Sequence, residues 1–173
     1  DQICDAALTV ARAIGYQNAG TVEFVLAPNG DFFFLEVNTR LQVEHPVTEY
    51  VSGLDLVAEQ IRVAEGSVLS FEQADLTQEG VSMELRIYAE DPKNNFMPVT
   101  GTLSDWHFPS KEGLRLDSGV RAGTEIGIHY DPMLAKLIGY APSRAECIRK
   151  LLAGLRGFSI GGIIAVCSFV AGP

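Results

Sequence analysis

Residues 21–37 constrain the fold most, because they have the pattern of a single β-hairpin. Two runs rich in β-branched and aromatic residues, Thr21–Leu26 and Phe32–Val37, flank the dipeptide Asn29-Gly30. Asn-Gly between such runs predicts a type I′ turn, because both residues tolerate the positive φ that this turn requires. A turn centred between Asn29 and Gly30 also fixes which residues of the two strands face each other.

In this register Glu23 lies opposite Glu36, and Thr21 lies opposite Asn38. Directly opposed side chains share one face of a hairpin, with Cβ atoms roughly 4.5–5.5 Å apart. Two carboxylates at that separation repel each other unless one takes up a proton or a cation lies between them. Mg²⁺ is commonly held by one or two carboxylates together with substrate phosphates. The pair is therefore a candidate metal site.

The competing interpretation is a half-exposed hairpin whose two glutamates face solvent. The same register predicts that Val25, Phe32 and Phe34 share the glutamates' face, so that face is not uniformly polar. Spacing alone leaves both interpretations open.

The segment after the hairpin carries three polar residues at alternate positions: Arg40, Gln42 and Glu44. An extended backbone would direct all three to one side. Arginine offers a planar fork that suits a carboxylate-shaped anion. A neighbouring glutamate can act as a general base on the same anion.

Composition bounds the class of protein. The chain has 173 residues, of which 47% are hydrophobic and 20% charged, enough for one domain or two small lobes. A net charge of −9 argues against a nucleic-acid surface. Three scattered cysteines indicate free thiols in a reducing compartment. The longest apolar stretch, Phe158–Pro173, is too short and glycine-rich for a membrane span of about 20 residues.

Hydrophobic periodicity divides the chain into a mixed first lobe and a strand-rich second lobe. We expect a boundary in the polar segment 67–80, with residues 1–66 before it and 81–173 after it. The predicted elements are helices over Ile3–Ile14, Leu54–Ala64 and Ser143–Leu155, a loop over Thr39–Tyr50, and strands over Ser82–Glu90, Gly101–Phe108, Leu114–Ser118, Thr124–Ile128 and Leu134–Tyr140. The fold class is α+β.

Basic residues are scarce where a nucleotide would need them. The first of four lysines is Lys93, and the first 60 residues carry only two basic side chains, Arg12 and Arg40. Nucleoside triphosphates are normally held by several cations. If the chain helps to bind ATP, most of the phosphate clamp comes from elsewhere. The first methionine is Met83, which also favours a piece of a longer protein.

The run EVNTRLQVEHPVTE, from Glu36 to Glu49, closely resembles the signature of biotin carboxylase, the ATP-grasp component of biotin-dependent carboxylases. The resemblance extends over roughly residues 1–160. It implies that residues 1–66 are the carboxy-terminal part of an ATP-grasp domain and that residues 81–173 are a small antiparallel β lobe with a flanking helix. After Gly162 the apolar tail departs from the family's pattern.

The resemblance also implies roles for individual residues. Glu23, Glu36 and Asn38 hold Mg²⁺ or Mn²⁺ against ATP; Arg40, Gln42, Val43 and Glu44 bind bicarbonate, with Glu44 as the base; and Arg86, in LRIYAEDP, faces the ureido oxygen of biotin. Taken without the resemblance, Arg86 has the pattern of a surface ion-pair partner on the polar face of its strand, beside Glu84 and Glu90.

The implied cofactors are ATP, a divalent cation and biotin attached to a carrier protein. The implied partners are the remaining lobes, the biotin carboxyl carrier protein, the carboxyltransferase and further copies of the chain, in the cytoplasm or the mitochondrial matrix. Two alternatives stay open. One is another ATP-grasp ligase, such as a carbamoyl-phosphate synthase, and the other is a non-catalytic assembly fragment.

Overall fold

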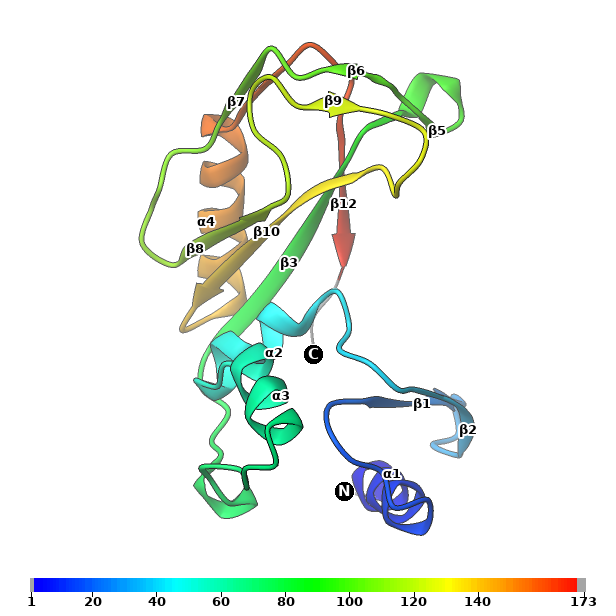
Figure 1. Cartoon of the computed structure of the whole chain (residues 1–173). Coiled ribbons are helices and arrows are strands. Elements are labelled where there is room, and N and C mark those ends of the chain that lie inside the picture. Colours follow the sequence, from blue (N-terminus) through cyan, green and yellow to red (C-terminus); the bar gives the residue numbers. More distant parts are fainter. Residues whose placement is uncertain (1, 171–173) are drawn as a thin grey trace. The chain divides into compact units, whose positions relative to one another are not determined.

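The computed structural model describes residues 2–170, which form two compact units (Figure 1). The first unit holds the chain up to His45 together with Leu54–Leu76, and the second holds Pro46–Gly53 together with everything from Thr77 onward. The helices are α1 (Gln2–Ala13), α2 (His45–Ser52), α3 (Leu56–Ala64) and α4 (Arg144–Gly157), with short 3₁₀ turns at Gln73–Asp75 and Pro92–Asn94. Within this part of the chain, none of the helices combines the length and hydrophobicity needed to cross a membrane.

The strands are β1 (Thr21–Leu26), β2 (Phe32–Asn38), β3 (Val81–Tyr88), β4 (Glu90–Asp91), β5 (Met97–Pro98), β6 (Gly101–Thr102), β7 (Asp105–His107), β8 (Leu114–Ser118), β9 (Glu125–Ile126), β10 (Met133–Ala141), β11 (Ser159–Gly161) and β12 (Val166–Val170). Strand β8 has the predicted bounds, and β3 and β10 differ from prediction by one or two residues. The mixture of helices and small antiparallel sheets confirms the α+β class.

The hairpin of the first unit has the predicted register at the glutamates but a different turn. Thr21 pairs with Asn38 and Glu23 with Glu36, as expected. The type I′ turn is wrong, because Gly30 has a positive φ of 91° whereas Asn29 does not. The N–H of Gly30 donates to the carbonyl of Ala27 at 2.9 Å, which closes a three-residue loop.

A β-bulge compensates for this longer loop. The pairing shifts by one residue between Glu23 and Phe24, so that Phe24 pairs with Phe34 and the extra residue of β2 is Leu35. Phe32 and Phe34 therefore lie on the face of Phe24, where their rings meet it edge to face at 5.6 and 6.2 Å. The prediction that these two rings share the glutamates' face is wrong, and the bulge is the reason.

Helix α2 replaces part of the loop predicted over Thr39–Tyr50. The helix begins at His45 directly after a turn at residues 43 and 44, so the expected extended segment does not continue to Glu44. Pro46 stands in the first turn of α2, where proline is tolerated because its missing N–H would have no partner within the helix.

A four-stranded antiparallel sheet, with strand order β12-β3-β10-β8, organises the second unit. Helix α4 lies along one face of this sheet and contacts β3, β10 and β8 (Figure 1). Its N-cap is Ser143, the first residue of the predicted helix, whose Oγ accepts the N–H of Glu146 at 3.4 Å. The core beneath it consists of buried apolar residues, namely Met83, Leu85, Ile87, Ala89, Leu134, Ala135, Leu137, Ala141, Cys147 and Leu151.

Helix α2 covers the opposite face. Its Tyr50 stacks on Tyr140 of β10 with ring centroids 5.5 Å apart, and its Glu49 accepts a hydrogen bond from Arg115 of β8 at 2.8 Å. Because β3 is an inner strand with both faces covered, Glu84 is fully buried. The prediction of a solvent-facing polar side for β3 is therefore wrong at Glu84.

The shorter strands form two-stranded ribbons, β4 with β5, β6 with β9, and β7 with β11. Trp106 and Phe108 pack edge to face on Phe158, which joins the β7 segment to the end of α4. The unusual apolar tail continues the sheet, because β12 pairs antiparallel with β3. Residues 171–173 of that tail lie outside the described residues.

Candidate functional site

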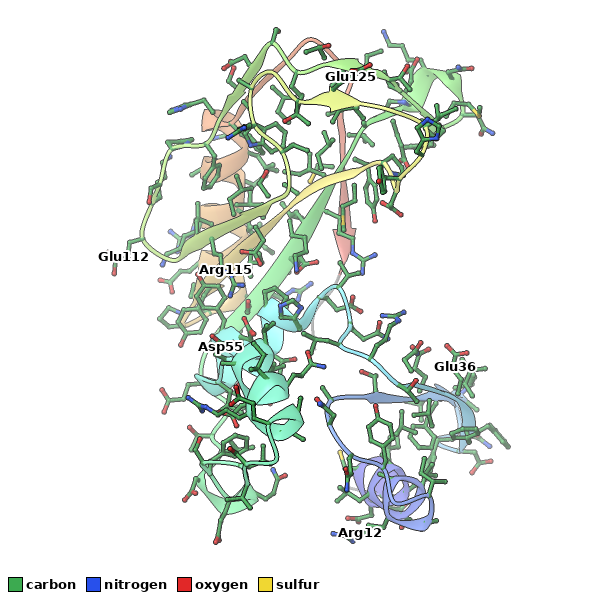
Figure 2. The ribbon with its side chains drawn as sticks, viewed as in Figure 1. Arg12, Glu36, Asp55, Glu112, Arg115 and Glu125 are labelled. Carbon is green, nitrogen blue, oxygen red and sulfur yellow. The ribbon has the colours of Figure 1, made fainter. Side chains whose placement is uncertain are left out.

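The amide of Asn38 lies between the two glutamates of the hairpin. Its Nδ2 donates to Glu23 Oε1 at 2.7 Å and to Glu36 Oε1 at 3.1 Å. Figure 2 labels Glu36 at the hairpin. The amide separates two carboxylates that the strand register would otherwise leave facing each other. The three residues predicted to hold the cation are thus brought together on one face.

The donor set fits a hard divalent cation that shares its coordination with a substrate. Two carboxylates and an amide oxygen are the oxygen ligands that Mg²⁺ takes, and phosphates and waters usually complete its octahedron. Among residues 2–170 no group of three or more His, Cys, Asp or Glu is arranged to hold a metal ion. The two carboxylates and one amide of the hairpin would leave coordination positions for phosphate oxygens and waters.

The segment predicted to bind bicarbonate continues this hydrogen-bonded chain. Gln42 Nε2 donates to Glu23 Oε1 at 3.3 Å, and the guanidinium of Arg40 donates to Gln42 Oε1 at 2.7 Å. Arg40 also donates to the carbonyl of Leu41 at 3.2 Å. Five predicted residues, from Arg40 through Gln42, Glu23 and Asn38 to Glu36, are thereby joined without interruption.

Val43 and Glu44 lie in the turn that leads into α2. Gln42 and His45 close this turn, because the N–H of His45 donates to the Gln42 carbonyl at 3.2 Å. The His45 ring contacts the same carbonyl through Nδ1 at 3.0 Å. His45 therefore holds the backbone around Glu44 through its N–H and its ring.

Arg86 lies in the second unit, on the face of β3 that α2 covers. Its guanidinium Nε is 3.8 Å from Glu84 Oε1, and Nη1 donates to the Tyr88 hydroxyl at 3.5 Å. The neighbouring strand β10 places Lys136 directly opposite Arg86. Arg86 is one of the eight predicted residues, and the other seven belong to the first unit.

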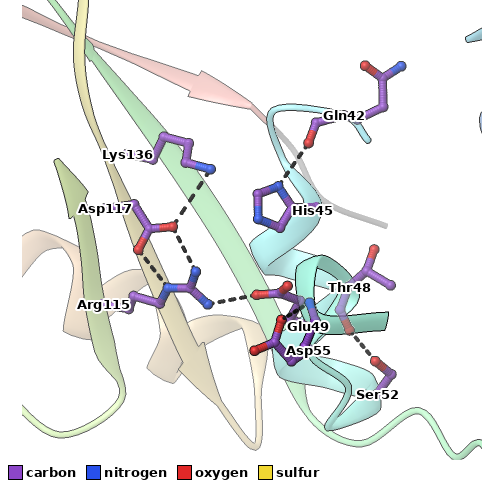
Figure 3. A network of polar contacts seen from close by, with 10 residues as sticks. Gln42, His45, Thr48, Glu49, Ser52, Asp55, Arg115, Asp117 and Lys136 are labelled. Atoms are coloured by element: carbon purple, nitrogen blue, oxygen red, sulfur yellow. Dashed lines mark hydrogen bonds and ion pairs between the residues drawn. The ribbon is translucent and has the colours of Figure 1, made fainter. Parts of the chain in front are cut away.

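A network of charged residues beside Arg86 was not predicted from the sequence (Figure 3). Arg115 donates to both oxygens of Asp117 at 2.6 and 2.8 Å and to Glu49 at 2.8 Å. Lys136 Nζ lies 3.7 Å from Asp117 Oδ2. The hydrogen bonds to Asp117 raise the pKa of Arg115 above its ordinary value, and burial raises the pKa of Tyr50 beside it.

The sequence did carry a partial signal for this network. Arg115 and Asp117 alternate within a predicted strand, and Lys136 lies in another, so a shared face was possible. Which strands are neighbours could not be deduced, because β3, β8 and β10 are separated by long connections. Glu49 closes the signature run but falls in the segment that was predicted to be a loop.

Comparison with known proteins matches each part of the chain to a family. Residues 84–172 match the family described as "Biotin carboxylase C-terminal domain", and residues 1–72 match "Carbamoyl-phosphate synthase L chain, ATP binding domain". The match of the second region favours the biotin carboxylases over the carbamoyl-phosphate synthases for the chain as a whole.

Individual relatives agree with this assignment. Biotin carboxylase 2 of Bacillus subtilis is 47% identical over 162 residues, a match that covers 94% of this chain and 36% of that protein. The mitochondrial propionyl-CoA carboxylase alpha chain of Homo sapiens is 48% identical over 161 residues, covering 92% and 22%. The chain thus spans about a third or less of the relatives it matches.

Solved structures show the same likeness in three dimensions. The biotin carboxylase domain dimer of Hydrogenobacter thermophilus 2-oxoglutarate carboxylase, in complex with MgADP, ADP and bicarbonate, superposes with a TM-score of 0.88 at 41% identity, covering 92% of this chain and 35% of that one. The biotin carboxylase subunit of pyruvate carboxylase gives a TM-score of 0.86 at 42% identity, covering 90% and 34%. The hydrogen-bonded hairpin, the sheet that carries Arg86 and these likenesses agree: the chain belongs to the biotin carboxylase family.

Proposed function

We propose that the chain is part of a biotin carboxylase that uses MgATP and bicarbonate to carboxylate biotin on a carrier protein, for later transfer to an acyl-CoA or a similar acceptor. The observation that carries the proposal is the continuous hydrogen-bonded chain from Arg40 through Gln42, Glu23 and Asn38 to Glu36. It joins the proposed anion-binding arginine to the proposed cation ligands. The related domain bound to MgADP and bicarbonate supports this pairing of ligands.

In the first step of the proposed reaction, bicarbonate attacks the γ-phosphate of ATP and forms carboxyphosphate and ADP. Glu23, Glu36 and Asn38 would hold the divalent cation, which would supply positive charge to offset that of the phosphates. Arg40 orients bicarbonate through a bidentate contact. Glu44 accepts the bicarbonate proton as the anion becomes a nucleophile.

In the second step, carboxyphosphate releases CO₂ and phosphate beside biotin. A base removes the ureido N–H proton, and the electron pair of that bond spreads onto the ureido oxygen. Arg86 stabilises this developing negative charge, as an oxyanion donor does in acyl transfer. The ureido nitrogen then forms a bond to CO₂, which gives carboxybiotin.

The proposed partners follow from the same reaction. Relatives of this chain are subunits of carboxylases, and one related domain is a dimer, which supports assembly with the remaining lobes, a biotin carrier, a carboxyltransferase and a second copy. The cytoplasm or the mitochondrial matrix is the proposed location. Its support is that Cys4, Cys147 and Cys167 are free thiols and that several relatives are mitochondrial.

Two substitutions in the full-length enzyme test this division of roles. Arg86→Ala should lower biotin carboxylation by about 10²–10³-fold, because it removes one donor to the developing oxyanion. It should leave the slow, biotin-independent cleavage of ATP with bicarbonate largely intact. Glu44→Gln keeps the side-chain shape but cannot accept a proton, so it should lower both reactions, biotin carboxylation by about 10²–10⁴-fold. The measurement is ATP turnover with and without free biotin.

The exposed Arg121 supplies a matched control, since Arg121→Ala removes a surface cation from the same unit and should change neither reaction. If Arg86→Ala abolished biotin-independent ATP cleavage and weakened ATP binding, Arg86 would belong to the nucleotide site. The proposed assignment of biotin to Arg86 would then be wrong.

A further inference from the structure

Arg86 has a second cation as its direct cross-strand neighbour. The register of β3 and β10 pairs Arg86 with Lys136, so both side chains lie on the same face of the sheet. Both are largely buried, with 23% of the Arg86 side chain and 12% of the Lys136 side chain exposed. Two like charges directly opposite each other on adjacent strands destabilise a sheet. The placement of two cations side by side on this face therefore needs a physical explanation.

The carboxylates nearby orient the two cations. Lys136 Nζ is 3.7 Å from Asp117, and Arg86 Nε is 3.8 Å from Glu84. Both separations exceed those of charge-assisted hydrogen bonds, which are about 2.7–2.9 Å. Asp117 itself is fixed by two shorter hydrogen bonds from Arg115, at 2.6 and 2.8 Å. Asp117 thus orients Lys136, and Arg115 fixes the position of Asp117.

A further bond anchors this arrangement to α2. Arg115 donates to Glu49, which is 9% exposed, so the arginine is held on both sides (Figure 3). The result is a preorganised row across three strands, with Arg86 on β3, Lys136 on β10 and Asp117 on β8. Preorganised charges of this kind stabilise a transition state well, because they need little reorganisation when the substrate's charge develops.

We propose that Lys136 is a second catalytic cation of the biotin site and that it shares with Arg86 the negative charge of the biotin ureido group during carboxylation. The proposal rests on the proposed function, which places Arg86 at the ureido oxygen. When the N–H proton leaves to the base, its electron pair spreads onto that oxygen. When the nitrogen bonds to CO₂, the charge moves to the new carboxylate. Two adjacent cations can stabilise both positions, whereas one cannot be centred on both.

The test uses the full-length enzyme and three variants. Lys136→Met removes the charge while keeping a flexible side chain, Lys136→Arg keeps the charge, and Lys93→Met removes an exposed lysine of the same unit as the control. Lys136→Met should lower kcat for carboxylation of free biotin by about 10²-fold, the usual effect of losing one oxyanion donor. Biotin-independent ATP cleavage should stay unchanged. Lys136→Arg should recover most of the activity, and Lys93→Met should match the parent enzyme.

The double variant Arg86→Ala with Lys136→Met adds a readout that a structural role would not produce. If both cations act on the same charge, the double loss should be smaller than the product of the single losses. A Lys136→Met enzyme with normal biotin carboxylation, or one that loses both reactions equally, would overturn the proposal.

Two further outcomes separate possible causes of failure. If Lys136→Met does not fold, Lys136→Met combined with Asp117→Asn removes both charges of the ion pair and is measured in the same way. Misfolding of that double variant as well would assign Lys136 to sheet stability and overturn the proposal. If Arg86→Ala also left carboxylation intact, the proposed function itself would have failed. If Arg86→Ala lowered biotin carboxylation while Lys136→Met did not, only the proposed role of Lys136 would be refuted.

Discussion

At the scale of single residues, Arg115 makes polar contacts with two carboxylates of the second unit. It binds Asp117 through two hydrogen bonds and Glu49 through a third. Glu49 is 9% exposed, so most of its hydration is lost, while the Arg115 side chain remains 37% exposed. The arginine offsets the desolvation of a buried carboxylate and ties α2 to the edge strand β8.

We expect Arg115→Ala to destabilise the chain by about 2 kcal/mol, which is below the usual cost of breaking a fully buried pair because solvent screens part of the interaction. The measurement is urea unfolding followed by circular dichroism. Arg149→Ala is the matched control. Its ion pair with Glu146 spans 3.5 Å, and the two side chains are 72% and 44% exposed. That variant should change stability by less than about 0.5 kcal/mol. Equal effects in the two variants would contradict the anchoring role of Arg115.

The sequence predicted individual residues best where local geometry alone decides their neighbours. Glu23 and Glu36 face each other as expected, and Asn38 joins them. The burial of Glu84 was missed because it depends on α2, a distant segment that covers the strand. Lys136 was missed because its proximity to Arg86 depends on which strands pair.

At the scale of elements, the close approach of α4 to β10 depends on Gly139. A Cβ added at this glycine would lie 2.7 Å from Leu151 Cγ and 3.3 Å from the sulfur of Cys147, both on α4. The separation from Leu151 Cγ is too short for two carbon atoms in contact, and the separation from the Cys147 sulfur is tight. The missing side chain therefore allows the helix to pack directly on the strand.

Gly139→Ala should force α4 away from the sheet and destabilise the chain by about 1–3 kcal/mol, the usual cost of overpacking. Gly119→Ala is the control, because a Cβ at Gly119 would meet nothing within 4 Å. Thermal unfolding of both variants measures the difference. A Gly139→Ala melting temperature equal to that of Gly119→Ala would show that α4 can shift without cost.

Elements with strong periodicity were predicted well, and elements set by loop detail were not. Helix α4, strand β8 and the pairing of Glu23 with Glu36 follow from patterns within one segment. The predicted type of hairpin turn was wrong. Glu23 and Glu36 still pair as predicted, because the bulge at Leu35 offsets the longer loop. Helix α2 lies within the predicted loop over Thr39–Tyr50, although Pro46 suits the first turn of a helix.

At the scale of the whole molecule, the first unit carries the proposed ligands for a cation but few positive charges for a triphosphate. Only Arg12 and Arg40 are basic among the first 60 residues, and Arg40 is already hydrogen-bonded to Gln42. Family members are longer than this chain, which spans 36% of the Bacillus subtilis relative. We infer that the remaining lobes supply most of the phosphate clamp.

The 173-residue chain alone should therefore show no bicarbonate-dependent ATP hydrolysis above background. The assay is phosphate release with and without bicarbonate, with the full-length enzyme as the positive control. Clear bicarbonate-dependent turnover by the chain alone would show that its few cations suffice for the first step of the reaction.

The interleaving of the two units has a consequence for dissecting this protein. The polypeptide passes from one unit to the other after His45, after Gly53 and again after Leu76. A single cut in the segment 67–80 would therefore leave α2 on the piece that carries the hairpin, although α2 packs with the other unit. The β-rich fragment would lose the stacking partner of Tyr140 and the carboxylate bound to Arg115. Expressing the two halves separately would expose a face that the intact chain covers, so domain swaps between carboxylases need to carry residues 46–53 along with the sheet.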